Sequence, residues 1–287
     1  MIVIKLQGGL GNQLFQLAAY LKLCERNENV YFDVGDYNLP WNNRFRKFYF
    51  DKFNINHEYK LCIFSESRRK CLFNAIINSN VKVFPKSLYK SLYKSNIGAG
   101  KLLSDDMSEI KDNTYVEGFF LNSRFFPDNL LDSIQQKKMI FHNRYYNSII
   151  KNESVSVHIR RTDYNNNPEY EGICTTDYYK KAINFIESKI NNAKFYFFSD
   201  DILWVKNEFG NSKNFIYIEN KNKKDSTITD LFLMSSCKHN IIANSTFSWW
   251  GAYFNKNPNK IVIRPEKYQN KSDSSIFPTE WIDVSKL

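Results

Sequence analysis

The chain has 287 residues, of which 43% are hydrophobic and 24% are charged, and this composition excludes disorder as its main state. No apolar run approaches the 18 residues that suggest a transmembrane helix, and five cysteines without a C-x-x-C pair disfavour a disulfide framework or a zinc site. The net charge of +10 predicts attraction to an anionic partner, such as a nucleotide, a nucleic acid or an anionic membrane.

The first fifty residues predict a strand, a glycine-rich turn, a helix and a second strand. Residues 2–6 are rich in β-branched residues, and residues 30–34 repeat this pattern. Between them a helix is predicted, because apolar side chains recur along one helical face at Leu14, Leu17, Ala18 and Leu21. The start of the chain is typical of a strand rather than of a signal peptide, so we expect a cytoplasmic location.

The middle of the chain is less regular. Residues 36–113 show no strong period, residues 114–117 are predicted to form a strand, and residues 129–136 a helix. Residues 60–101 contain nine lysines and arginines against the single Glu66. We treat contact of this segment with an anionic membrane surface as a hypothesis, centred on Arg68, Arg69 and Lys70; a solvated loop is the alternative.

From about residue 152, strands and helices alternate. The predicted strands span residues 154–160, 194–199, 214–219, 239–243 and 260–264, and the helical patterns include residues 179–190, 226–238 and 246–254. Alternation of this kind predicts βαβ units and a parallel sheet. We therefore expect two α/β domains, residues 1–150 and 151–287, with the boundary in the polar, weakly patterned residues 143–151.

The glycine-rich turn is the first candidate site. Gly9 and Gly11 fit the G-x-G start of a dinucleotide fingerprint, but Leu14 stands where the third glycine belongs. A tight turn from strand to helix explains the glycines equally well. The neighbouring amides of Asn12 and Gln13 are suited to binding the hydroxyl groups of a sugar.

The second candidate is the end of the strand at residues 154–160. Alternation places His158 and Arg160 on one face, and ligands of a parallel sheet bind beyond the carboxyl ends of its strands. In one arrangement Arg160 holds a diphosphate through its guanidinium fork, and Arg161 pairs with Asp163 or a neighbouring carboxylate. The alternative is an arginine–aspartate pair that only stabilises a turn.

The third candidate is the segment of residues 244–251, which follows a short strand and opens a helix. Polar side chains next to the free N–H groups of a helix start are typical of a phosphate site. The polar residues here are Asn244, Ser245, Thr246 and Ser248. Simple N-capping is the alternative. Trp249 and Trp250 are expected to pack in the core.

No Asp-x-Asp motif occurs, and we expect no metal site. Without a metal, the charge of a leaving diphosphate must be stabilised by arginine, backbone dipoles and hydroxyl groups, which the second and third candidates supply.

Together, residues 8–16 (GGLGNQLFQ), 158–164 (HIRRTDY) and 244–251 (NSTFSWWG) resemble the bacterial α-1,2-fucosyltransferases of glycosyltransferase family 11. The resemblance spans nearly the whole chain. Residues 115–126 are similar to the family's Y-x-x-G-aromatic segment, with Arg124 where lysine is commoner.

The resemblance implies a GT-B fold, with two facing Rossmann-like domains and parallel sheets. It implies metal-independent, inverting transfer of L-fucose from GDP-β-L-fucose to the 2-hydroxyl of a galactose-terminated oligosaccharide or lipid-linked glycan, in cell-surface glycan synthesis. No cofactor is implied besides the donor substrate.

The resemblance also implies roles for individual residues. Arg160 would hold the β-phosphate and assist departure of GDP, and Asn12 would face the reacting centre. His158 and Asp230 would lie near the guanine and ribose. The other donor-binding positions would be Gly9, Gly11, Arg161, Asp163, Asn244, Ser245, Thr246 and Ser248.

Several alternatives remain open from the sequence. A general base is not identified, and Asp33, Asp36 and Glu117 are candidates. Another GDP-fucose-dependent transferase, of α-1,6 type, would share the donor residues. A nucleic-acid-binding protein would explain the charge, but no RRM, KH or zinc-finger pattern is present, so we expect no nucleic-acid partner. A lectin-like module without activity would bind sugar but not turn over the donor.

Overall fold

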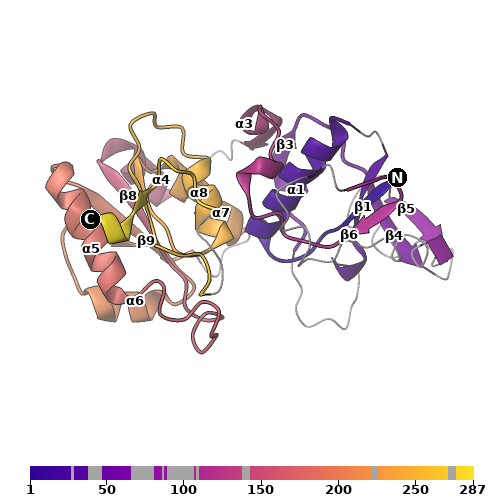
Figure 1. Ribbon diagram of the computed structural model, residues 1–287. Coiled ribbons are helices and arrows are strands. Elements are labelled where there is room, and N and C mark those ends of the chain that lie inside the picture. The colour runs from indigo at the N-terminus through magenta and orange to yellow at the C-terminus, as the bar shows by residue number, and fades with distance from the viewer. Residues whose placement is uncertain are drawn as a thin grey trace. The chain divides into compact units, whose positions relative to one another are not determined.

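A computed structural model of the protein describes residues 1–26, 29–37, 47–65, 81–85, 87–88, 107, 110–137, 143–220, 225–270 and 276–287 (Figure 1). The chain divides into two compact units, Met1–Lys137 and Lys138–Leu287. No helix within the described ranges combines the length and the apolar character needed to cross a bilayer.

Unit 1 is built on a parallel sheet with the strand order β5-β4-β2-β1-β6. Its strands are β1 (Ile2–Lys5), β2 (Val30–Asp33), β4 (Leu61–Ser65), β5 (Val81–Pro85) and β6 (Thr114–Val116). A separate antiparallel pair joins β3 (Phe53–Ile55) to β7 (Ile134–Gln136). The short helices are η1 (Gly35–Tyr37), η2 (Phe50–Lys52), η5 (Ser123–Phe125) and α3 (Leu130–Ser133).

Helix α1 (Leu10–Cys24) packs against one face of the unit 1 sheet. Its side chains are buried almost all round, which is typical of an apolar helix enclosed in a core. The Tyr20 ring is stacked on Phe32 of β2, with ring centroids 4.5 Å apart. Because α1 directly follows β1, this packing places the glycine-rich turn at the carboxyl edge of the sheet.

Unit 2 is a second parallel sheet, with the order β10-β9-β8-β11-β12-β13. Its strands are β8 (Ser154–Ile159), β9 (Lys194–Ser199), β10 (Phe215–Tyr217), β11 (His239–Ile241), β12 (Val262–Arg264) and β13 (Ile282–Asp283). Its helices are α4 (Arg144–Lys151), α5 (Thr176–Lys189), α6 (Ile202–Phe209), α7 (Ser226–Ser236), α8 (Thr246–Tyr253) and η6 (Val284–Lys286).

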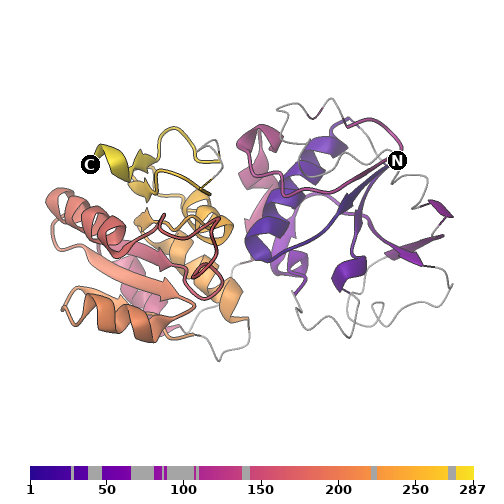
Figure 2. The same ribbon diagram turned by 60° about the horizontal axis from the view of Figure 1, so that its bottom comes forward.

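Helices cover both faces of the unit 2 sheet (Figures 1 and 2). Val155, Val157 and Ile159 of β8 are buried against α5 and α6 in one apolar cluster. The alternate side chains of β8 face α7, because Asn240 of β11 donates both to Ser156 Oγ (2.7 Å) and to the Met234 carbonyl of α7 (2.9 Å). The prediction of two α/β, Rossmann-like domains with parallel sheets is confirmed.

The structure corrects two predictions. The units divide after Lys137 rather than after residue 150, because residues 144–151 form α4, which packs against α7 of unit 2. Only four residues of the predicted helix over 129–136 are helical (α3), since Ile134 starts a strand that pairs with β3 and is fully buried.

Candidate active site

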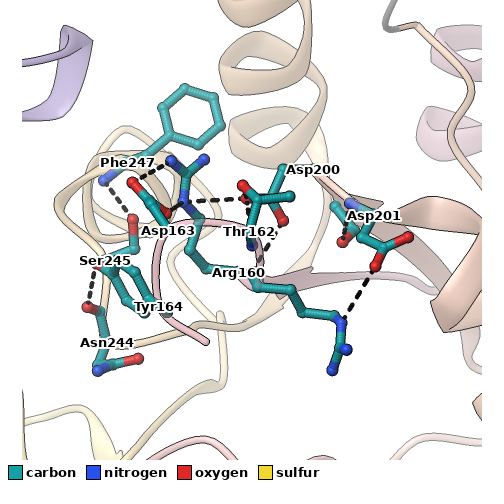
Figure 3. A network of polar contacts seen from close by, with 11 residues as sticks. Arg160, Thr162, Asp163, Tyr164, Asp200, Asp201, Asn244, Ser245 and Phe247 are labelled. Atoms are coloured by element: carbon teal, nitrogen blue, oxygen red, sulfur yellow. Dashed lines mark hydrogen bonds and ion pairs between the residues drawn. The ribbon is translucent and has the colours of Figure 1, made fainter. Parts of the chain in front are cut away.

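The polar residues of the second and third motifs meet at one edge of unit 2. Strands β8, β9 and β11 are parallel neighbours, so their carboxyl ends lie side by side. The segments that follow these strands carry Arg160, Asp200 and Ser245, respectively. Figure 3 shows their side chains gathered in one network, at the edge where ligands of parallel sheets bind.

Arg160 is held by two carboxylates. Its Nε and Nη2 donate to the two oxygens of Asp163, at 2.6 and 2.7 Å, and its Nε lies 3.3 Å from Asp200 Oδ2. Burial alone lowers the pKa of Arg160, but the bond to Asp163 and the charge of Asp200 outweigh it and raise the pKa. The guanidinium therefore stays charged, and its plane is fixed while part of the group remains exposed.

Asp200 organises the turn after β8. It accepts hydrogen bonds from the backbone N–H groups of Arg161 (3.0 Å) and Thr162 (3.2 Å) and from the Thr162 hydroxyl (2.6 Å). Burial raises the pKa of Asp200, but the Thr162 bond and the charge of Arg160 outweigh it and lower the pKa. Asp200 is thus a carboxylate at neutral pH and holds the loop that carries Arg160.

Arg161 points to a different partner. Its Nε lies 3.4 Å from Asp201 Oδ2, and its guanidinium carbon lies 3.5 Å from the centre of the Trp204 ring in α6. The predicted pairing of Arg161 with a neighbouring carboxylate is found with Asp201, whereas Asp163 pairs with Arg160. Adjacent aspartates separate here: Asp200 contacts the β8 turn, and Asp201 caps α6 by accepting from the Trp204 N–H.

The third motif opens α8 as the sequence predicts. Ser245 is the N-cap, and its hydroxyl accepts from the Phe247 N–H at 3.3 Å. The Asn244 amide donates to the Tyr268 carbonyl (3.1 Å), and the Ser248 hydroxyl lies 3.4 Å from the carbonyl oxygens of Ala243 and Ser245. Asn244, Ser245, Thr246 and Ser248 are all buried. Trp249 and Trp250 are fully buried, as expected for core packing.

His158 lies under this edge, on the face of β8 opposite the α5–α6 cluster. Its side chain is 4% exposed, its ring centroid is 5.5 Å from that of Phe247, and its Nδ1 has no hydrogen-bond partner among the described residues. Burial and then the charge of Arg160 lower the pKa of His158 to about 4. The imidazole is therefore neutral near pH 7.

Asp230 occupies α7 and accepts a hydrogen bond from Asn220 Nδ2 at 2.9 Å. Burial raises the pKa of Asp230 to about 6. The place of Asp230 beside the nucleotide stays a prediction.

The glycine-rich loop of unit 1 surrounds Asn12. Gly8 has φ +82°, and a Cβ added there would lie 2.6 Å from Asn12 Nδ2, so the loop requires glycine at this position. Gly9 is the N-cap of α1, and Gly11 lies within its first turn. The amide of Gln13 is instead fully buried and bonded to the Gly8 and Lys47 carbonyls, so the suggested sugar-binding role of Gln13 is wrong.

The three candidate bases differ in what surrounds them. Asp33 accepts from Tyr115 Oη at 2.7 Å and from the Gly35 N–H at 2.9 Å. Glu117 lies 3.6 Å from Lys5 Nζ. The side chain of Asp36 lies outside what the structure describes. A base role for any of them stays a prediction.

Two further expectations concern metals and the membrane. No group of three metal-ligating side chains occurs in the described parts of the chain. The basic segment of residues 60–101 lies largely outside the described residues, including Arg68, Arg69 and Lys70. Within it, Lys82 Nζ donates to Tyr31 Oη at 3.0 Å.

Asp200 and Asp201 belong to the site, although no sequence motif singles them out. Two adjacent aspartates directly after a predicted strand were the available signal, because that position brings them to the same edge as Arg160. Their partners lie 39 and 40 positions earlier in the chain, so only the strand order reveals the pairing.

An arginine and the start of a helix at the carboxyl edge of a parallel sheet are typical of proteins that bind an anionic ligand. The model of the family described as glycosyl transferase family 11 matches residues 1–285. The chain therefore belongs to glycosyl transferase family 11, and the resemblance seen in its motifs is confirmed.

Relatives over the full length are bacterial. The chain is 33% identical to an alpha-1,2-colitosyltransferase of Escherichia coli, over 99% of each chain. It is also 33% identical to the O-antigen biosynthesis glycosyltransferase WbnK of Escherichia coli, over 97% of this chain and 99% of WbnK. The galactoside 2-alpha-L-fucosyltransferase Sec1 of Mus musculus is 28% identical over 46% of this chain and 38% of its own length.

Among solved structures, the fucosyltransferase NodZ from Bradyrhizobium is similar with a TM-score of 0.49 and 13% identity, over 87% of this chain and 91% of NodZ. POFUT1 in complex with GDP has a TM-score of 0.48 and 12% identity, over 93% of this chain and 98% of POFUT1. The assignment to glycosyl transferase family 11 rests on the family match and the full-length relatives.

Proposed function

We propose that this glycosyltransferase carries L-fucose from GDP-β-L-fucose to the 2-hydroxyl of a galactose-type acceptor, with inversion, without a metal, and in the synthesis of a cell-surface glycan. In this proposal unit 2 binds the donor and unit 1 binds the acceptor. Where the protein works on lipid-linked glycans, it contacts the inner face of the plasma membrane.

The observation that carries the donor proposal is the fixed guanidinium of Arg160 at the carboxyl edge of the unit 2 sheet. The Nε–H and one N–H of Nη2 of Arg160 donate to Asp163. The remaining N–H groups on Nη1 and Nη2 can therefore donate to a phosphate. The N-terminus of α8, capped by Ser245, adds backbone N–H groups at the same edge.

In the proposed reaction, the bond between the fucose anomeric carbon and the β-phosphate oxygen breaks as the acceptor hydroxyl attacks from the opposite face. Negative charge grows on the leaving diphosphate, and Arg160 and the α8 N-terminus stabilise it. The hydroxyl proton leaves to a base or to water. Asn12 of unit 1 orients the reacting sugars.

The test is acceptor-dependent release of GDP from GDP-fucose in EDTA, with lactose or a Gal-β-1,3-GalNAc glycan, for wild type and Arg160→Ala. We expect turnover in EDTA and a loss of about 10²- to 10³-fold in kcat in the variant, because one oxyanion donor is removed. Lys189→Ala is the control, because this exposed lysine is the last residue of α5, which runs from the carboxyl edge of the sheet back to the opposite edge. Turnover that depends on a divalent metal, or that survives Arg160→Ala, contradicts the proposal.

A second donor is favoured by the full-length relative that transfers colitose. Colitose is L-fucose without its 3-hydroxyl group, so a site for one sugar differs from a site for the other by a single hydrogen-bonding position. Comparison of kcat/KM for GDP-fucose and GDP-colitose decides between them. A preference for GDP-colitose would leave the proposed transfer mechanism unchanged and would make colitose, not fucose, the transferred sugar.

A further inference from the structure

Asn220 and Asp230 form a polar pair that no step of the proposed mechanism uses. Asn220 stands just beyond the carboxyl end of β10, is 2% exposed, and donates from Nδ2 to Asp230 Oδ1 at 2.9 Å. Asn220 Oδ1 is buried without a hydrogen-bond partner among the described residues. An orphaned carbonyl of this kind costs folding free energy unless a ligand satisfies it.

The pair lies on the same side of the sheet as His158. Asn240 bonds to both Ser156 of β8 and Met234 of α7, which places Met234 over Ser156. Helix α7 runs back across the sheet, so Asp230, one turn before Met234, is displaced toward the carboxyl edge. His158 is displaced in the same direction by two residues of β8. Asp230 and His158 are therefore both shifted from the Ser156–Met234 level toward the carboxyl edge of the sheet.

Two of the three buried polar atoms that lack partners in the described residues belong to this region, Asn220 Oδ1 and His158 Nδ1. The third, Arg264 Nε, belongs to another strand. Unsatisfied groups gathered on one face beside a proposed donor site indicate a polar ligand rather than a random packing defect.

The free atoms of the pair select the ligand. Asn220 Nδ2 already occupies one oxygen of Asp230, so the pair presents two hydrogen-bond acceptors, Asn220 Oδ1 and Asp230 Oδ2, next to each other. Among nucleobases, guanine carries two adjacent donors, N1–H and the 2-amino group. Adenine and cytosine place a donor beside an acceptor, and uracil and thymine offer a single N–H between two carbonyls.

We infer that Asn220 is a specificity-determining residue for the donor nucleotide: its Oδ1 accepts from the guanine 2-amino group, and its Nδ2 holds Asp230 in place to accept from N1–H. This inference rests on the proposed function, which requires a nucleotide donor in unit 2. It adds the residue that distinguishes guanine from the other bases.

The test compares the dissociation constants of GDP and of IDP, which lacks the 2-amino group, by calorimetry without acceptor. We expect wild type to bind GDP roughly tenfold more tightly than IDP, the value of one well-placed hydrogen bond. In Asn220→Leu and Asn220→Ser, we expect GDP affinity to fall toward that of IDP, so that the ratio approaches one. A ratio measured on one variant is insensitive to its stability.

Asn152→Leu is the matched control, because Asn152 also makes a local amide bond, to the Ser148 carbonyl, but lies before the start of β8 at the other edge of the sheet. Its GDP-to-IDP ratio should equal that of wild type. Equal binding of GDP and IDP by wild type, or an unchanged ratio in both Asn220 variants, overturns the inference and leaves the donor proposal standing. Binding of neither nucleotide overturns both.

Discussion

The guanidinium of Arg160 binds both oxygens of the Asp163 carboxylate, three residues further along the chain. This pair fixes the plane of the group proposed to stabilise the leaving diphosphate. Asp163 itself is about half exposed, so its contribution to folding is small, while its effect on the direction of the Arg160 N–H groups is large.

Asp163→Asn tests that relationship. The side-chain amide of asparagine cannot accept from both Nε and Nη2, so Arg160 loses its fixed plane and we expect kcat/KM for the donor to fall about 10- to 100-fold. The unfolding free energy should change by less than about 1 kcal/mol. Steady-state kinetics and urea unfolding measure the two effects. Asp177→Asn, at an exposed position of α5, is the control that should leave both unchanged.

We expect Arg161 to stabilise the fold rather than to contact the donor. Its guanidinium packs on Trp204 and pairs with Asp201, so Arg161→Ala should lower the unfolding free energy by about 1 kcal/mol. A double-mutant cycle with Trp204→Leu should show a coupling of similar size. If Arg161 instead contacts the donor, as the sequence motif predicts, GDP affinity will drop in Arg161→Ala as much as in Arg160→Ala.

Asp230 makes the free energy of unfolding depend on pH, because burial raises the pKa of its carboxyl group. Its pKa of about 6 in the folded protein exceeds the value of about 4 for an unfolded aspartate. The folded state therefore holds more protons between these values, and the free energy of unfolding falls as the pH rises from 4 to 6, by at most about 3 kcal/mol.

Asp230→Asn removes the buried negative charge that wild type carries at pH 7, so the variant should be more stable than wild type at pH 7 but not at pH 4. Urea unfolding of both proteins at the two pH values measures the difference. His158, whose pKa of about 4 lies below its usual range, acts in the opposite direction in both proteins, so its effect cancels in the comparison. A difference between variant and wild type that is independent of pH would contradict the raised pKa.

Gly8→Ala tests the position of Asn12. The new Cβ would come within 2.6 Å of Asn12 Nδ2, and the left-handed φ adds about 1 kcal/mol of strain. Gly172→Ala is a matched control, because Gly172 also has a left-handed φ but no atom lies within 4 Å of its added Cβ. Both variants should lose stability, whereas only Gly8→Ala should lose activity, to the level of Asn12→Ala. Equal activity in the two glycine variants would remove Asn12 from the proposed site.

Periodic patterns were sufficient for the regular elements. The alternation in β8 correctly separated the Val155 face from the face that carries His158, because a strand's side chains alternate whatever surrounds it. Short amphipathic elements were not predicted by these patterns. Helix α4 buries only Tyr145 and Ile149 and begins at Asn143, which accepts from the Tyr145 N–H; the sequence there reads as polar linker.

By itself, the sequence determined the two α/β units, the family, and the three motifs that end strands or open helices, since each depends on residues close together in the chain. The tertiary structure decided the partners. Asp163 pairs with Arg160 rather than with Arg161, Asp200 holds the turn after β8, and Asn220 donates to Asp230. The Asp200 contact follows from the order of strands in the sheet and joins residues 38 positions apart. The other two pairs lie 3 and 10 positions apart, and they depend on how a loop folds back and on how α7 packs across the sheet. None of these contacts leaves a periodic trace in the sequence.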